Sequence, residues 1–244
     1  MTLAIEIGVG VGQAAAAAAA AGVSAGGAAA YFSPVAWRHR RMSRIRRQVA
    51  DSRVLALTYD DGPSNTVTPE VLDLLGRRGV RATFFMLGCN ARQYPEIVDR
   101  AIAEGHEVGC HTYRHLNAWK TTPWRAVADI QAGYEGLSRW IRPDALFRPP
   151  HGKMTLPTYW ELRRRGAPVW WWTLDSGDTN ATRPEPGQVA DRLRRDRGGI
   201  VLMHDLDRGQ ERRDFVLKTT EALLDVAEQE SLKVVTLGEL CRTK

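Results

Sequence analysis

A length of 244 residues, with 43% hydrophobic and 25% charged residues, fits one α/β domain with a good core and is ordinary for a soluble enzyme. The formal net charge is +6, but residues 1–50 hold six arginines and a single acid, so the remaining chain carries only about +1. This balance argues against a nucleic-acid-binding catalytic domain, and three cysteines exclude a disulfide framework.

Residues 1–50 form an Ala/Gly-rich apolar leader followed by an Arg-rich arm. Residues 7–37 carry no charge and are long enough for a membrane span. A cleaved signal segment, a disordered leader and a start at Met42 are equally compatible with this composition. The arginine run predicts either a solvated linker or a membrane-surface contact, and its position favours a cytoplasmic domain if the leader spans. We expect a membrane or cell-envelope location, with the cytoplasm as the alternative.

From Arg53 onward, short apolar strands alternate with amphipathic helices, which predicts parallel βα units. The expected strands are 54–57, 82–87, 107–110, 169–172, 199–204 and 234–235. The expected helices are 68–78, 94–104, 124–141, 156–165, 188–195 and 213–228, with a final turn at 237–241. We expect most of the tryptophans in 170–172 to pack in the core, because strands of such a fold are buried on both faces.

Two adjacent acids, Asp60 and Asp61, stand at the end of the first apolar strand, where Gly62 and Pro63 stop it. Side chains alternate along a strand, so the two carboxylates point in different directions. One can then hold a metal ion while the other works as a base.

His111 and His115 lie four positions apart, directly after another expected strand end. On a helical turn or a tight loop this spacing places both imidazoles on one side. Two imidazoles and a carboxylate are a common ligand set for catalytic Zn²⁺, with the fourth position open for water.

Three further strings place polar side chains at strand ends. Arg148 is stiffened by two following prolines, Asp175 and Asp178 follow the tryptophan run, and His204 ends an apolar strand. Catalytic groups at the carboxyl ends of parallel strands are typical of α/β barrels.

These strings, in this order, resemble the polysaccharide deacetylase (NodB-homology) family from about Arg53 to Leu240. The resemblance implies an α/β fold, an incomplete (β/α)7-type barrel with the active site at the C-terminal ends of the strands. Residues 51–244 would be the catalytic domain.

The resemblance implies roles for the acids and histidines. Asp60 would be the general base, and Asp61, His111 and His115 would ligate the metal. His204 would be the general acid.

The resemblance also implies supporting roles. Arg148 would orient Asp60, and Asp178 would pair with the acid histidine. The backbone N–H of His151 would bind the oxyanion, and Leu202 would wall the acetyl pocket. The sequence departs from the family pattern at Thr179, where a tryptophan is usual, and at His151, where a tyrosine is frequent.

The function predicted from this resemblance is a metal-dependent N-deacetylase acting on an N-acetylated amino sugar in a polymer, an oligomer or a lipid- or nucleotide-linked form. The expected cofactor is a divalent metal, Zn²⁺ before Co²⁺ or Ni²⁺. An amidase or cyclic-imide hydrolase on a non-sugar substrate is the alternative that the missing tryptophan keeps open. Two less favoured hypotheses for the function are a non-catalytic carbohydrate-binding relative of the family and a membrane-surface scaffold. We expect a monomer whose partner is the saccharide, with no nucleic acid and with membrane contact only through residues 1–50.

Overall fold

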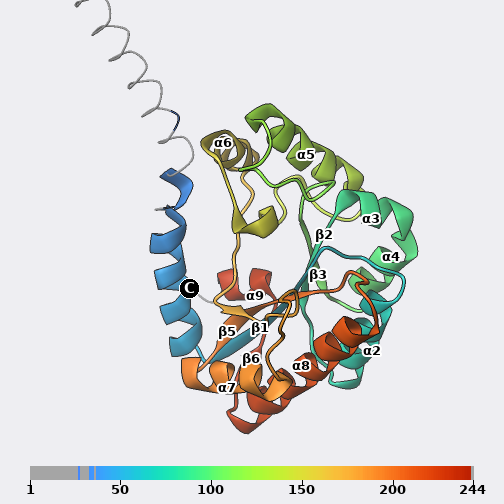
Figure 1. Cartoon of the computed structure of the whole chain (residues 1–244), viewed down its shortest axis with the longest axis vertical. Coiled ribbons are helices and arrows are strands. Elements are labelled where there is room, and N and C mark those ends of the chain that lie inside the picture. The colour runs from blue at the N-terminus through green and yellow to red at the C-terminus, as the bar shows by residue number, and fades with distance from the viewer. Residues whose placement is uncertain (1–26, 28–32, 36, 243–244) are drawn as a thin grey trace, which may run out of the picture.

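The computed structural model describes residues 27, 33–35 and 37–242, and within them a parallel sheet runs through the centre of the molecule (Figure 1). Its strand order is β3-β2-β1-β5-β4, and β6 pairs with the start of β1. The strands are β1 (Val54–Asp60), β2 (Thr83–Met86), β3 (Glu107–Cys110), β4 (Leu174–Asp175), β5 (Gly199–His204) and β6 (Lys233–Val234).

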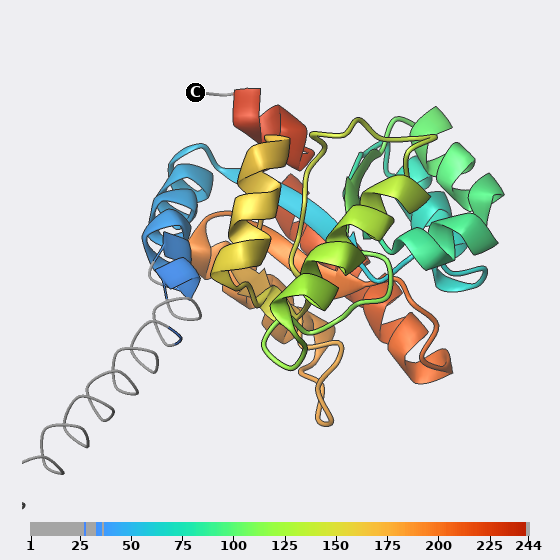
Figure 2. The same cartoon turned by 90° about the horizontal axis from the view of Figure 1, so that it is seen from above.

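Helices surround this sheet, as the view from above shows (Figure 2). They are α2 (Val67–Arg77), α3 (Gly88–Gln93), α4 (Pro95–Ala103), α5 (Pro123–Gly136), α6 (Leu156–Arg165), α7 (Pro186–Asp196), α8 (Gln210–Gln229) and α9 (Leu237–Arg242). Local chemistry sets several boundaries: a capping box at Thr155 begins α6, and Gly166 ends it in the left-handed conformation (φ 76°). The predicted alternation is confirmed, although α3 had no sequence signal.

The sheet continues beyond β3 through single parallel bridges from Cys110 to Phe147 and from Phe147 to Val169. Together with β4 at the opposite edge, these bridges curl the sheet into an incomplete barrel. The predicted α/β class is therefore confirmed. Every residue of β1 is buried, so this apolar strand forms the centre of the core.

The strand predicted at residues 169–172 is wrong. Val169 makes one bridge, and regular pairing begins only at β4. The N–H of Trp170 donates to the carbonyl of Phe147 at 2.8 Å, and the next carbonyl, that of Trp171, accepts a hydrogen bond from the Arg148 guanidinium at 3.4 Å. Trp170 and Trp171 are buried in the core, as expected, whereas Trp172 is only partly buried.

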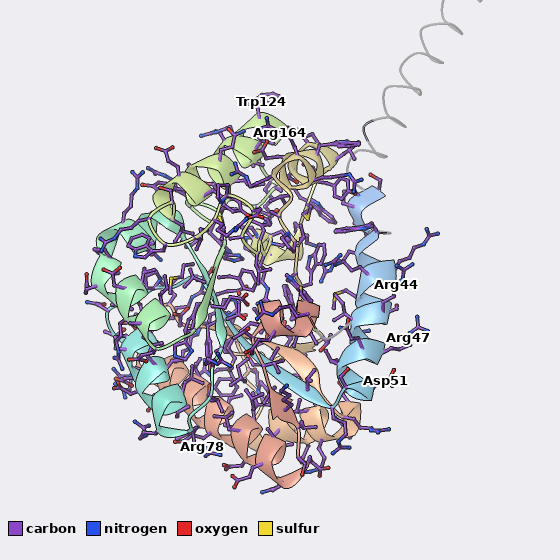
Figure 3. The ribbon with its side chains drawn as sticks, turned by 180° about the vertical axis from the view of Figure 1, so that it is seen from behind. Arg44, Arg47, Asp51, Arg78, Trp124 and Arg164 are labelled. Carbon is purple, nitrogen blue, oxygen red and sulfur yellow. The ribbon has the colours of Figure 1, made fainter. Side chains whose placement is uncertain are left out.

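The arginine run is neither a solvated linker nor separate from the domain. Residues 37–51 form a helix, here called the N-terminal helix, and its Met42, Ile45 and Val49 belong to the hydrophobic core. The other face carries Arg44 and Arg47, which extend away from the body (Figure 3). Apolar positions spaced by three and four residues explain this division of the helix into two faces.

No helix within the described residues is both long and apolar enough to cross a membrane. The predicted leader lies outside the described residues, apart from residues 27 and 33–35.

Candidate active site

The strand register brings the first acid and the last histidine of the predicted site together. Asp60 ends β1 directly beside His204, which ends β5. Paired residues of neighbouring parallel strands direct their side chains to the same face, so both face the mouth of the barrel. Leu202 lies two residues earlier on β5, beside Thr58, and therefore faces the same way.

A three-residue cluster stands next to this pair. The ligand atoms of Asp61, His111 and His115 all lie within 4.8 Å of one another. Oδ1 of Asp61 is 3.2 Å from Nε2 of His115 and 3.5 Å from Nε2 of His111. This carboxylate oxygen is buried and has no hydrogen-bond partner, which is costly unless a cation satisfies it. The predicted ligand set is thus assembled around an unsatisfied acceptor.

The ring of His111 is prepared to act as a ligand through Nε2. Its Nδ1 lies 2.7 Å from the carbonyl of Arg148, which can only accept, so Nδ1 carries the proton. Burial lowers the pKa of His111 to about 3, so the ring is neutral at pH 7. A neutral imidazole oriented by a backbone carbonyl is a common arrangement in metal sites.

Arg148 holds the base candidate from inside the protein. Its fully buried guanidinium donates to Oδ1 of Asp60 at 2.8 Å and to the hydroxyl of Thr58 at 2.7 Å. Burial raises the pKa of Asp60, and the positive charge of Arg148 opposes that rise. The ion pair therefore favours the ionised form of a desolvated carboxylate and fixes its direction.

On the other side, Asp178 holds the acid candidate. Its carboxylate lies 3.0 and 3.1 Å from Nδ1 of His204 and accepts the backbone N–H of His204 at 2.8 Å. Burial alone would lower the pKa of His204, but the hydrogen bond and charge of Asp178 raise it to about 9. The imidazolium form is thus favoured at neutral pH.

Left-handed backbone is concentrated at this site. Asp61, Thr112, His115 and His151 have φ of 73°, 71°, 60° and 53°. Such conformations cost non-glycine residues about 1–3 kcal/mol each, and they persist where the surroundings impose them. The fold holds these side chains in directions that relaxed strand ends would not give.

The predicted residues line one cleft of about 310 Å³. Its walls are Asp60, Asp61, His111, His115, His151, Trp172, Asp175, Thr179, Leu202, His204 and Arg208. All nine predicted site residues are therefore brought together: seven line the cleft, and Arg148 and Asp178 support it from behind. The ring of His151 packs edge-on against His115, with centroids 4.6 Å apart.

Sequence reasoning missed Arg208. Its Nη2 donates to Oδ2 of Asp61 at 2.9 Å, so the oxygen that does not face the histidines is held by a guanidinium. Arg208 lies in the loop between β5 and α8, four residues beyond His204. One arginine in a polar loop carries no signal, and only the loop's path shows the contact.

A second missed residue is Asp205, which is fully buried. Its Oδ2 accepts from the Thr68 hydroxyl at 2.7 Å, and its Oδ1 has no partner. Burial raises the pKa of Asp205 to about 7. A Cβ on Gly62 would come within 2.3 Å of this carboxylate, so only glycine fits the turn after the two site aspartates.

Comparison with known proteins identifies the class to which this fold and site belong. The family described as Polysaccharide deacetylase matches residues 47–183. The chain belongs to the polysaccharide deacetylase family, which confirms the expected class of hydrolase acting on carbon–nitrogen bonds.

Relatives within the family share about a third of the sequence. A peptidoglycan-N-acetylglucosamine deacetylase of Bacillus cereus is 32% identical over 80% of this chain and 91% of its own length. A chitooligosaccharide deacetylase of a Bradyrhizobium strain is 31% identical over 80% of this chain and 95% of its own.

Solved structures agree with this assignment. The Bc1960 peptidoglycan N-acetylglucosamine deacetylase, crystallised with a hydroxamate-type benzamide, has a TM-score of 0.71 at 28% identity and covers 80% of this chain and 91% of its own. The chitin deacetylase of the fungus Colletotrichum lindemuthianum has a TM-score of 0.67 at 30% identity and covers 78% and 87%.

Proposed function

We propose that the chain is a metal-dependent N-deacetylase that hydrolyses the acetamide of an N-acetylated amino sugar. The observation that carries this proposal is the metal-type cluster with a held base on one side and a held acid on the other. Asp60 is fixed by Arg148, and His204 is fixed by Asp178. Amide hydrolysis needs both groups, because water must lose a proton and the leaving nitrogen must gain one.

Asp61, His111 and His115 are the proposed metal ligands. The unsatisfied Oδ1 of Asp61 and the two imidazoles form a mixed oxygen and nitrogen donor set, which suits Zn²⁺, with Co²⁺ and Ni²⁺ as alternatives. When bound, the cation lowers the pKa of water and polarises the acetamide carbonyl.

The chain's own residues then move the protons. Asp60 accepts a proton from the attacking water, and Arg148 stabilises its ionised form before that step. The Nε2–H of His204 donates to the departing sugar nitrogen as the carbon–nitrogen bond breaks, giving acetate and a free amine. Asp178 accepts the hydrogen bond of Nδ1 throughout, so it keeps His204 protonated until donation.

Two further groups are proposed to bind the acetyl part. The backbone N–H of His151 donates to the oxyanion, an interaction worth about 3 kcal/mol in comparable sites. Leu202 lies on the same side of the sheet as His204 and lines the cleft, so its side chain would wall the methyl group.

For the substrate class, we propose an N-acetylglucosamine-containing oligomer or envelope polymer, because relatives named for peptidoglycan and chitooligosaccharides each match most of this chain. The corresponding location is the cell envelope, with membrane contact through residues 1–50. We propose a monomer whose catalytic domain, expected from residue 51, also includes the packed N-terminal helix. Thr179 lines the cleft at a position where the family usually has a tryptophan. Because that aromatic side chain is missing, an amidase acting on a non-sugar substrate is the alternative function.

The test is acetate release by the full chain from N-acetylglucosamine oligomers, peptidoglycan fragments and sugar-free acetamides, each with Zn²⁺. We expect release from the sugars and none from the simple amides. If acetate is released from the sugar-free amides alone, the protein is an amidase on a non-sugar substrate and the proposal is wrong.

A further inference from the structure

The inner face of the N-terminal helix reaches the back of the active-site wall. The ring of Trp37 packs edge-on against Trp171, with centroids 5.4 Å apart. It packs in the same way against Tyr159 of α6, at 5.3 Å. These contacts seat the start of the helix against the tryptophan segment that leads to β4.

Arg38, the next residue, reaches further in. Its Nη1 donates to the carbonyl of Gly152 at 3.2 Å, and the indole N–H of Trp171 donates to the same oxygen at 3.2 Å. The guanidinium carbon also lies 5.5 Å from the centroid of Trp172. Arg38 thus joins the turn after Arg148 to the tryptophan that lines the cleft.

The turn that Arg38 contacts has an unusual backbone. His151 and Gly152 are both left-handed, with φ of 53° and 65°. A Cβ on Gly152 would lie 3.1 Å from both the Arg38 guanidinium and the Trp172 ring. Helix, turn and tryptophan are therefore in close contact, directly beside the left-handed backbone of His151.

We propose that Arg38 is a positioning residue for the active site. Through the Gly152 carbonyl and the Trp172 ring, it fixes the His151 backbone and the cleft wall. The inference rests on the proposed function for its catalytic consequence, because His151 is proposed there to bind the oxyanion. A chain that began at Met42 would lack this contact.

The experiment compares Arg38→Gln with Arg44→Gln in the full, Zn²⁺-loaded chain. Arg44 is a matched control, since it is on the same helix but its side chain extends into solvent (Figure 3). We expect Arg38→Gln to lower kcat for acetate release about 10-fold or more, since small misplacements of catalytic groups cost up to about 100-fold. KM and Zn²⁺ affinity should stay within about twofold of the control, which a general loss of structure would not allow. A kcat equal to that of Arg44→Gln would overturn the proposal.

A second readout does not depend on the deacetylase activity. Hydrogen–deuterium exchange of the backbone should increase in residues 148–154 of Arg38→Gln and stay unchanged in α5. Unchanged exchange in 148–154 would overturn the role of Arg38, even if the enzyme acts on another substrate. If Arg38→Gln does not fold, Arg38→Lys, which keeps the charge but loses the planar group, is measured in the same way. If Arg38→Lys shows both wild-type exchange in residues 148–154 and a wild-type kcat, the proposal is likewise overturned.

Discussion

The active site and the N-terminal helix use the same residue type in opposite ways. Arg148 is fully buried, and its charge is matched by Asp60 at 2.8 Å. Arg44 and Arg47 extend into solvent, while Met42, Ile45 and Val49, one or two positions away on the same helix, are part of the core. The role of an arginine in this protein therefore follows from the face that carries it, and a run of charges does not reveal which face of a helix is buried.

The largest effect is expected at Asp178. Replacing it with asparagine removes the charge that raises the pKa of His204, so kcat should fall by about 10² to 10⁴. In the proposed mechanism activity needs protonated His204, so it should be lost as the pH rises through the pKa of this residue, about 9. In Asp178→Asn the alkaline limb of the pH–rate profile should move to lower pH. An unmoved limb would show that another group sets it.

Arg208→Gln tests the contact that the sequence did not reveal. Its guanidinium donates to Oδ2 of Asp61 and leaves Oδ1 without a hydrogen-bond partner, available to the proposed metal. Losing such a supporting contact typically weakens metal binding about 10- to 100-fold, which titration with Zn²⁺ would measure. Tighter binding in Arg208→Gln would mean that Arg208 competes with the metal instead of supporting its ligand.

Ile45→Ala tests whether the N-terminal helix is part of the domain. Ile45 is 5% exposed, and truncating such a side chain costs about 2–5 kcal/mol of unfolding free energy. Arg44→Gln, one residue away on the exposed face, should change it by less than about 0.5 kcal/mol. Denaturant unfolding measures both free energies. Equal values for the two variants would mean that the helix does not contribute to the stability of the domain.

Asp205→Asn should give the smallest effect, a change in the pH dependence of stability. Because burial raises the pKa of this carboxyl from 3.8 to about 7, the folded state binds its proton more tightly than the unfolded state. Stability is therefore lost as the pH rises from about 4 to about 7. With EDTA present, wild type should lose more Tm between pH 5 and pH 8 than the variant. Parallel changes in both proteins would contradict the shifted pKa.

Much of the site could be predicted because its residues follow apolar strands. Asp60, His111 and His204 each end or follow a strand with a clear hydrophobic pattern, and parallel strands direct their ends to one edge. The register that places Asp60 beside His204 then follows from the fold. Roles such as that of Arg148 came from the family resemblance rather than from spacing.

What the sequence could not predict depends on contacts between distant segments. Arg208 and Asp61 are 147 positions apart, and nothing in either string refers to the other. The segment 169–172 looks like a strand because tryptophan and valine favour strands. It makes a single bridge instead, and Trp171 hydrogen-bonds Arg148 through its carbonyl and Gly152 through its indole N–H. Tertiary hydrogen bonds outweighed local propensity there.

The proposed roles of the metal and of Asp60 are tested together by acetate release from an N-acetylglucosamine oligomer. The full chain is measured with and without Zn²⁺, beside Asp60→Asn. Asparagine keeps the shape of the side chain but cannot accept the proton of the attacking water. We predict release that needs the metal, falls by about 10² to 10⁴ in the variant, and leaves Zn²⁺ binding intact. Undiminished release by Asp60→Asn, or release that persists without metal, would contradict the proposed metal-dependent mechanism with Asp60 as its base.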